Sequence, residues 1–349
     1  MKNRLNTIIA TIVALGCITA CSQDDVVVFD ESPKTPISFN VGFGILPSPD
    51  VSTRGYTTTQ AVGGYTFSGG EYMAIAVTGK GVTTRSTTEV VKQYSISAGN
   101  SGNNALTYQK DADGTSKTDA YNWLSNNETV SIRAWSDGKT TTPAAAIAAD
   151  PDGQAFTIES TQSGDVKELL YSPAKDYTNS DTNSDGIADT QEISLYHQLS
   201  RIVVNVKDDA DGSPTIAAIS IGHDSDGHRV PKTGTFAKPT SGNNYGTWSG
   251  QTNLGTITPK LETTATSGYE HTYTAVVIPG GTTFYPAGMK LINITIGGEN
   301  FSYTIPAGGI TLNSGKQYNY NITVKNRAII LTISVTAWTN DARSIDFAE

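Results

Sequence analysis

The oxygen-rich segment 181–192 has the spacing with the clearest chemistry in this sequence. It matches a calcium-binding loop, with ligands at the first, third, fifth, seventh, ninth and twelfth positions and a glycine at the sixth. The expected ligands are Asp181, Asn183, Asp185, the backbone carbonyl of Ile187, Asp189 and Glu192. Calcium takes about six to eight oxygens, which this spacing supplies. An ordinary turn is the alternative, because other Asp-Gly pairs in the chain are simple turns and no long helix flanks the loop.

A second polar cluster, residues 223–228, brings His223, Asp224, Asp226 and His228 close together in sequence. These side chains are possible metal ligands, but a solvated hairpin turn is the favoured interpretation. Motifs for a nucleophile elbow, a zinc helix, a phosphate loop or a dinucleotide site do not occur. Paired carboxylates for glycoside hydrolysis are recognised by the distance between them in the folded protein, so the sequence gives no signal for such a pair. We therefore expect no catalytic centre.

The two cysteines, Cys17 and Cys21, both lie at the end of an N-terminal leader. Lys2 and Arg4 precede an apolar run, 8–18, which is too short to span a bilayer comfortably and is typical of a secretory signal. The residues before Cys21 resemble a bacterial lipobox, so Cys21 is the expected acylated residue, with Cys17 as a weaker alternative. The acidic tetrapeptide that follows, residues 22–25, resembles the surface-export signal of Bacteroidetes lipoproteins. These features predict a lipid anchor in the outer membrane, facing outward.

The charge of the chain argues against nucleic acid as a partner. The net charge is −9, and no cluster of Lys or Arg occurs beyond the leader. Phosphate backbones need concentrated positive charge, so we expect no nucleic acid partner.

Alternation with a period of two predicts an all-β protein with antiparallel sheets and little helix. The clearest strands are expected at 202–207, 291–296, 301–305 and 318–325. Asp-Gly and Gly-Gly pairs such as 297–298 predict hairpin turns. Short helices are expected only at 144–149 and around 119–125.

Breaks in the pattern predict two β-sandwich domains. A first strand at 37–43 is separated from the body by a Pro/Ser/Asp-rich linker, 46–54, and a second polar break covers 176–191. The expected parts are the leader (1–21), the export tetrapeptide with the first strand and linker (22–54), and the two domains, 55–190 and 191–349.

Several segments, in this order, resemble the fimbrillin family of Bacteroidetes pilins, whose domains are transthyretin-like sandwiches. They are residues 36–41 with 53–54, 168–172, 195–206, 304–318 and 337–338. The resemblance implies a fimbrial subunit or adhesin that assembles with copies of itself or with other fimbrial subunits. In this mechanism a protease cuts after an arginine, here Arg54, the first strand leaves, and the groove accepts a C-terminal strand from another subunit. The candidate donor strand lies within 327–349, with an apolar face formed by Ile329, Leu331, Ile333 and Val335.

Two alternatives stay open. Both strands complete their own sandwich in an uncut anchor or tip subunit. A surface glycan-binding lipoprotein of a nutrient-uptake system would share the leader and sandwiches, but would gather Trp123, Trp135 and Trp248 on one exposed face. Buried, dispersed tryptophans favour the fimbrial interpretation, in which the host or bacterial surface ligand is unknown. His197, between Leu195 and Leu199, is expected to be a core histidine.

Overall fold

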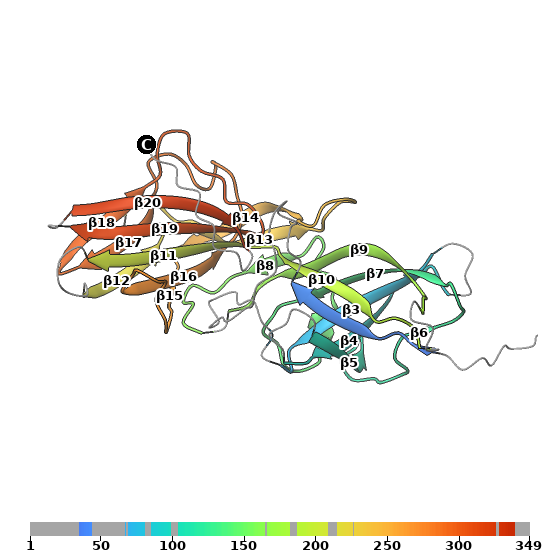
Figure 1. Ribbon diagram of the computed structural model, residues 1–349. Coiled ribbons are helices and arrows are strands. Elements are labelled where there is room, and N and C mark those ends of the chain that lie inside the picture. The colour runs from blue at the N-terminus through green and yellow to red at the C-terminus, as the bar shows by residue number, and fades with distance from the viewer. Residues whose placement is uncertain are drawn as a thin grey trace, which may run out of the picture. The chain divides into compact units, whose positions relative to one another are not determined.

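The structure, a computed structural model, describes strands and loops from Thr35 to Trp338 (Figure 1). The described residues are 35–43, 67, 69–80, 85–98, 104–164, 166–181, 187–208, 215–225, 227–325 and 328–338. The expected leader, Cys21 and Arg54 lie outside them. Within the described part the chain is almost entirely β, with one helical turn, α1 (Ala145–Ala148). The predicted all-β class with little helix is confirmed.

Strands of the first half form a closed barrel in the order β10-β2-β5-β4-β3-β7-β9. Their bounds are β2 Phe39–Phe43, β3 Tyr72–Gly79, β4 Val90–Ile96, β5 Asn104–Asp111, β7 Thr129–Ser136, β9 Leu170–Thr178 and β10 Gln191–His197. A separate ribbon pairs β1 (Thr35–Pro36) with β6 (Asn122–Trp123). Neighbouring barrel strands are antiparallel except β2 and β10, which are parallel. Closure removes the free edges that an open sheet would present.

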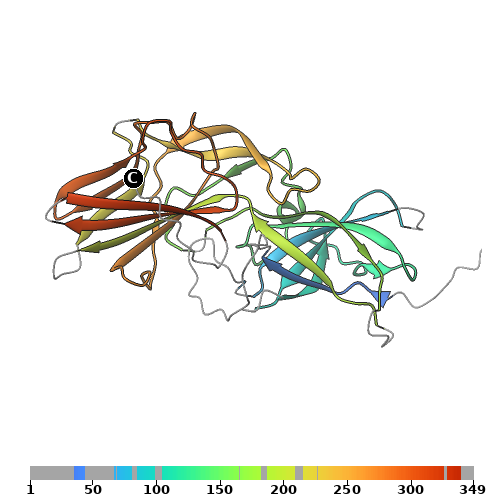
Figure 2. The same cartoon turned by 45° about the horizontal axis from the view of Figure 1, so that its top comes forward.

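The remaining strands, all but β8 from the second half of the chain, form three further sheets (Figure 2). A five-stranded sheet has the order β15-β16-β11-β19-β20, and the three-stranded sheets are β12-β17-β18 and β14-β13-β8. The bounds are β8 Ala155–Thr157, β11 Ser200–Asp208, β12 Ile216–Ile221, β13 Val230–Ala237, β14 Thr247–Gly255, β15 Lys260–Leu261, β16 His271–Val277, β17 Lys290–Ile296, β18 Glu299–Thr304, β19 Lys316–Lys325 and β20 Ala328–Ala337. The pair β11 and β19 is parallel.

The period-two pattern places one face of each strand in a core. In β19, Tyr318, Tyr320 and Ile322 are buried in the same hydrophobic cluster as Ile202 of β11 and Leu291 of β17. Alternate residues of a strand point to opposite faces, so this side of the sheet is apolar. The strands expected at 202–207, 291–296, 301–305 and 318–325 are thus present as β11, β17, β18 and β19.

Sheet membership changes slightly later than the expected boundary near residue 190. β10 pairs with β2 and β9 of the barrel, and β11, which begins at Ser200, belongs to the five-stranded sheet. In the other direction, β8 pairs with β13 although it precedes residue 190. The polar break predicted at 176–191 overlaps the end of β9 and the start of β10, so it falls between two strands of the same barrel. Turn residues look alike whether they join strands of one sheet or of two.

Local turn predictions agree with the structure in part. Gly297 and Gly298 have φ of 58° and 84° and connect β17 to β18, as the hairpin prediction requires. The helix expected around 119–125 is wrong, since β6 lies there and Tyr121 and Trp123 are buried. Among the described residues, helices long and apolar enough to cross a membrane do not occur.

Candidate functional site at the first strand

The first strand of the barrel, β2, contains most of the strand predicted at 37–43 and has a hydrogen-bonded neighbour on each side. It pairs with β10 from Phe39↔Gln191 to Phe43↔Leu195, and with β5 at Asn40↔Ala105 and Val41↔Asn104. Figures 1 and 2 both show β2, in blue, alongside β10. A segment close to the N-terminal end of the described chain thus completes the barrel between two strands from much later positions.

Alternation explains which side of β2 is inside. Ile37, Phe39 and Val41 are 4%, 3% and 0% exposed, whereas Ser38 between them is exposed. The apolar three pack in the barrel core, as predicted for a strand with one apolar face. Their sites would become apolar pockets if the strand left.

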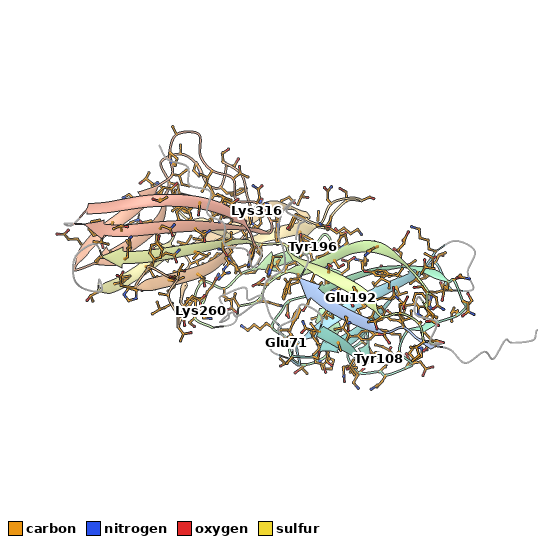
Figure 3. All side chains as sticks on the ribbon, viewed as in Figure 1. Glu71, Tyr108, Glu192, Tyr196, Lys260 and Lys316 are labelled. Atoms are coloured by element: carbon orange, nitrogen blue, oxygen red, sulfur yellow. The ribbon has the colours of Figure 1, made fainter. Side chains whose placement is uncertain are left out.

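Main-chain hydrogen bonds hold the N-terminal end of this segment. The amide of Ile37 donates to the carbonyl of Tyr121 at 2.8 Å, and the amide of Gln191 donates to the carbonyl of Ser38 at 2.9 Å. A side-chain bond also joins β2 to β10, since Asn40 Nδ2 donates to Glu192 Oε1 at 3.0 Å. Glu192 is labelled in Figure 3. Departure of the strand would leave backbone donors and acceptors of β5 and β10 unpaired.

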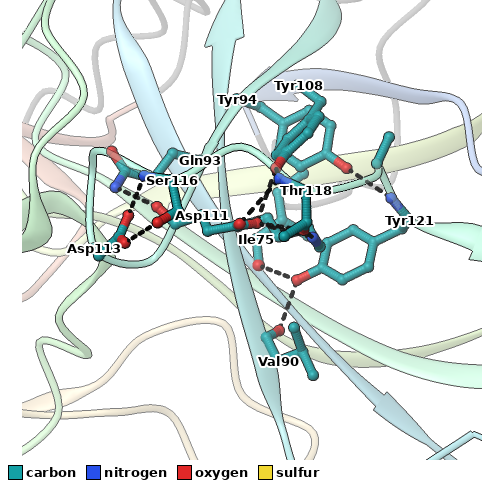
Figure 4. Close-up of polar contacts among 12 residues, drawn as sticks. Ile75, Val90, Gln93, Tyr94, Tyr108, Asp111, Asp113, Ser116, Thr118 and Tyr121 are labelled. Atoms are coloured by element: carbon teal, nitrogen blue, oxygen red, sulfur yellow. Dashed lines mark hydrogen bonds and ion pairs between the residues drawn. The ribbon is translucent and has the colours of Figure 1, made fainter.

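Phe39 occupies a pocket that is lined by aromatic rings. Its ring meets Tyr94 edge-on at 5.6 Å between centroids and Tyr121 edge-on at 6.3 Å. The Tyr121 hydroxyl lies 2.9 Å from the carbonyl oxygen of Ile75 and 2.6 Å from that of Val90, both within its donating reach (Figure 4). Burial raises the pKa of the Tyr121 hydroxyl well above its usual value, which keeps it a donor. The pocket wall is therefore fixed to the backbone of β3 and β4.

A charged cluster supports this wall from the rim. Lys92 Nζ lies 2.9 Å from Asp111 Oδ1 and donates to Thr118 Oγ1 at 2.7 Å. The Tyr108 hydroxyl donates to Asp111 Oδ1 at 2.8 Å (Figure 4). Burial acts to raise the pKa of Asp111, but hydrogen bonds from Lys92, Tyr108 and Thr118 outweigh it and hold the pKa below its usual value. The carboxylate thus ties β4 to the loop that leads to Tyr121.

A stack of rings marks the other end of β2. Phe43 lies parallel to His197 at 5.2 Å and to Phe67 at 4.9 Å, and His197 in turn stacks on Trp338 at 4.0 Å. His197 Nδ1 is 2.5 Å from Glu168 Oε2, and both side chains are buried. The expected core histidine is thus buried, and it touches both the first strand and the residue after β20.

The candidate donor strand, β20, is an edge strand. It pairs with β19 along its full length, from Lys316↔Ala337 to Lys325↔Ala328. Ile333 and Val335 are half-buried against the core of the second half. For Ile329 and Leu331 the structure gives the backbone register, and their side chains lie outside the described part. An edge strand loses one ladder of hydrogen bonds when it leaves, while an interior strand such as β2 loses two.

The expected calcium loop is described only at its ends, since Asn183 and Asp185 lie outside the described residues. Asp189 accepts a hydrogen bond from the Ser180 hydroxyl at 2.8 Å, and Glu192 accepts the bond from Asn40. Groups of three or more His, Cys, Asp or Glu side chains suited to a metal do not occur among the residues that are described. Calcium binding stays a prediction.

The described residues of the second polar cluster, 223–225 and 227–228, adopt the hairpin turn that the sequence favoured, and Asp226 lies outside the described part. The amide of His223 donates to the carbonyl of His228, Gly227 has φ of 71°, and Arg229 pairs with Asp224 at 2.9 Å. The backbone amide of Lys290 donates to His228 Nδ1 at 3.1 Å. These contacts account for the cluster as a surface turn.

The tryptophans lie in hydrophobic clusters, Trp123 in one and Trp135 and Trp248 together in another, and they do not form one exposed face. Trp123 and Trp135 are buried, and Trp248 is partly buried and packs on Phe236 and Phe156. The indole N–H of Trp135 donates to the carbonyl of Ile147, and that of Trp248 to the carbonyl of Gln198. This is the arrangement that favours a scaffold over a sugar-binding platform.

Two wall residues, Tyr94 and Tyr121, and the partner of His197, Glu168, were not singled out as a site from the sequence. Tyr121 and Trp123 alternate, and their period of two was the usable signal, although it was interpreted as a helix. No local sequence pattern indicates the pairing of Glu168 with His197, because Glu168 precedes β9 whereas His197 ends β10.

Comparisons with known proteins agree with this fold. No curated protein sequence matches the chain. A crystal structure of a candidate cell adhesion protein from Bacteroides uniformis superposes with a TM-score of 0.54 at 13% identity, covering 87% of this chain and 98% of that one. A similar protein from Bacteroides ovatus gives 0.53 at 14% identity, covering 88% and 99%. The family model described as fimbrillin-like matches residues 53–338, and the chain therefore belongs to the fimbrillin-like family.

Proposed function

We propose that this protein is a fimbrial subunit or adhesin that joins its neighbours by strand exchange at the bacterial surface. The observation that carries the proposal is the interior position of β2, between β5 and β10, in a segment that precedes the body of the barrel. Cleavage after Arg54 would separate this strand from the remaining chain. The groove would then take a strand from another subunit.

Energetics favour exchange over an empty groove. Burial of Ile37, Phe39 and Val41 contributes about 1.5 to 3 kcal/mol each. Loss of β2 also leaves unpaired backbone groups on both neighbouring strands. An incoming strand restores both contributions, as in other cases of β-augmentation.

We assign the donated strand to β20. It is an edge strand with a single hydrogen-bonded neighbour, β19, and residues of its apolar face, Ile333 and Val335, are only half-buried at home. Transfer to a groove with neighbours on both sides doubles its backbone pairing and buries this face more completely. The subunit that receives it is a copy of this chain or another fimbrial subunit.

Anchoring would precede assembly. Acylation of Cys21 holds the chain in the outer membrane, and the tetrapeptide 22–25, with its two aspartates, directs it to the outer face. Cleavage after Arg54 removes this anchor together with the first strand. A subunit that is not cut would stay at the membrane as the base of a fimbria.

The test uses protein recovered from the native cell surface, with N-terminal sequencing, intact mass and a gel ladder of multimers. We expect a mature terminus at Gly55 and multimers, both lost in Arg54→Ala, with Arg229→Ala, an exposed arginine, as the control. Ile333→Asn should leave cleavage intact and abolish multimers, whereas Thr332→Asn, its exposed neighbour, should not. An uncut, acylated monomer in the wild type would contradict strand exchange and favour an anchor or a glycan-binding lipoprotein.

A further inference from the structure

We propose that the first-strand groove selects an incoming strand with aromatic rings at two positions four residues apart on one face, so that its occupant comes from a different subunit and not from β20 of a second copy. This inference rests on the proposed strand exchange and names the partner. The required strand carries four side chains in order on one face: a branched aliphatic one, an aromatic ring, a β-branched one and a second aromatic ring. In this chain they are Ile37, Phe39, Val41 and Phe43.

The first ring site is the pocket of Phe39. Its wall cannot close around a smaller side chain, because the Tyr121 hydroxyl is held by the carbonyls of Ile75 and Val90. Tyr94 is also fixed, since it stacks near Tyr121 at 6.2 Å and meets Tyr108 at 5.7 Å. A leucine in this pocket would lose two edge-on ring contacts and leave a cavity.

The middle site is narrow. Val41 is fully buried between Ile193 of β10 and Asn104 of β5, with Asn104 Nδ2 donating to the Val41 carbonyl at 3.4 Å. Ile193 is buried as well. A compact β-branched side chain suits this site, and a charged one would be buried without a partner.

The second ring site is the stack at Phe43. A planar ring here lies parallel to His197, with 2° between planes, and to Phe67, with 13°. The imidazole is held in orientation by Glu168 and by Trp338. Flat, parallel partners favour a flat occupant, whereas a branched aliphatic chain loses the stacking contribution.

The face of β20 does not meet these requirements. Neither face of the strand carries a ring: one face has Ile329, Leu331, Ile333, Val335 and Ala337, and the other has Ala328, Ile330, Thr332, Ser334 and Thr336. Trp338 follows the strand in phase with Ser334 and Thr336, but the positions four residues from it are Ser334 and Ala342. Every register therefore leaves at least one ring site filled by an aliphatic or polar side chain. β20 thus fits a groove of different shape, in another subunit.

Residues 339–349 offer only one ring of the pair. Ile345 and Phe347 have the spacing of Ile37 and Phe39. That alignment places Glu349 at the site of Val41, where its carboxylate would be buried. This segment is therefore a poorer occupant than a strand with the full pattern.

The experiment measures peptide entry into the groove. The full chain without its leader is cut after Arg54 in excess fluorescent peptide of residues 35–43, and unlabelled peptides compete for the groove. We expect Phe39→Leu and Phe43→Leu peptides each to bind about tenfold more weakly, because ring contacts and packing are lost. The matched control is Ser38→Ala, at an exposed position, which should bind like the parent. Peptides of residues 328–338 and 339–349 should bind about a hundredfold more weakly than the parent, because each leaves at least one ring site of the groove without an aromatic side chain.

The outcomes separate the two proposals. Equal binding of the 328–338 or 339–349 peptide would overturn selectivity and leave strand exchange standing. Failure of every peptide, including the parent, would overturn strand exchange and selectivity together. If the cut chain aggregates first, melting of the uncut chain is compared instead: Phe39→Leu and Phe43→Leu should lower the midpoint relative to Ser38→Ala, and unchanged midpoints would overturn the shape requirement.

Discussion

The imidazole of His197 stacks on the indole of Trp338, with ring centroids 4.0 Å apart and 9° between planes. His197 ends β10, and Trp338 follows β20. The same imidazole stacks on Phe43 at the end of β2 and bonds Glu168. One buried side chain therefore contacts the strand that is proposed to leave and the end of the strand that is proposed to be donated.

Replacement of His197 should be costly for the uncut chain. We expect His197→Ala to lower the free energy of unfolding by about 2 to 4 kcal/mol, because it removes both ring stacks and leaves the Glu168 carboxylate buried without this partner. Urea denaturation provides the measurement, with His223→Ala in a surface turn as the control. A loss under about 0.5 kcal/mol, the range of ordinary surface substitutions, would show that the stack contributes little.

The pocket wall makes a separate prediction. Tyr121→Phe removes the hydroxyl that reaches the carbonyls of Ile75 and Val90, and should cost about 1 to 3 kcal/mol of unfolding free energy because buried acceptors lose a donor. Tyr94→Phe is the matched control, since its hydroxyl only accepts a long bond, 3.5 Å, from the Tyr121 amide. Equal effects of the two variants in urea denaturation would contradict a pinned wall.

Strand content and the inward face of β2 were predictable from the sequence, because alternation is a local property. Ile37, Phe39 and Val41 are buried as their spacing requires. The closure of the barrel was not predictable, since the parallel pairing of β2 with β10 joins residues from opposite ends of the first half. Local patterns carry no information about which strands become neighbours.

The candidate site illustrates the same limit. The segments that contain Glu168 and His197 were both noticed, yet their contact depends on the barrel that brings them together. Phe39 lies on the alternating apolar face of the strand predicted at 37–43, but its cage depends on Tyr94 and Tyr121 from two other segments. Positions can be assigned to a core from the sequence, whereas pocket shape follows from the tertiary fold.

Acid should weaken the rim of the pocket. The folded pKa of Asp111 lies below its usual 3.8, as burial is outweighed by bonds from Lys92, Tyr108 and Thr118. Its contribution is therefore complete at pH above that unfolded value and is lost as pH falls through the folded pKa. Asp111→Asn should flatten the loss of thermal stability below about pH 4. Asp119→Asn, at an exposed carboxylate nearby, should not, and equal slopes in wild type and Asp111→Asn would contradict the assignment.

Calcium binding is the prediction for segment 181–192. Titration calorimetry should give a dissociation constant of about 10⁻⁴ to 10⁻³ M, the range of extracellular modules. Asp181→Ala should abolish the heat, because it removes the first ligand of the loop. Asp113→Asn, in an Asp-Gly turn elsewhere, should leave it unchanged. Identical titrations for wild type and Asp181→Ala would show that the loop is an ordinary turn.

Gly315 lies directly before β19 and is hydrogen-bonded to Trp338, directly after β20, so it helps to position Trp338 in the stack with His197. Its φ is 67°, and an added Cβ would collide with the Tyr245 ring. Its amide donates to the carbonyl of Leu199, and its carbonyl accepts from the amide of Trp338. We expect Gly315→Ala to lower the unfolding free energy by about 1 to 3 kcal/mol, since a left-handed backbone and overpacking both oppose a side chain. Gly164→Ala, where an added Cβ meets open space and the backbone is not left-handed, should be neutral in the same urea experiment. A neutral Gly315→Ala would mean that Tyr245 moves aside freely and that this turn does not fix Trp338 against His197.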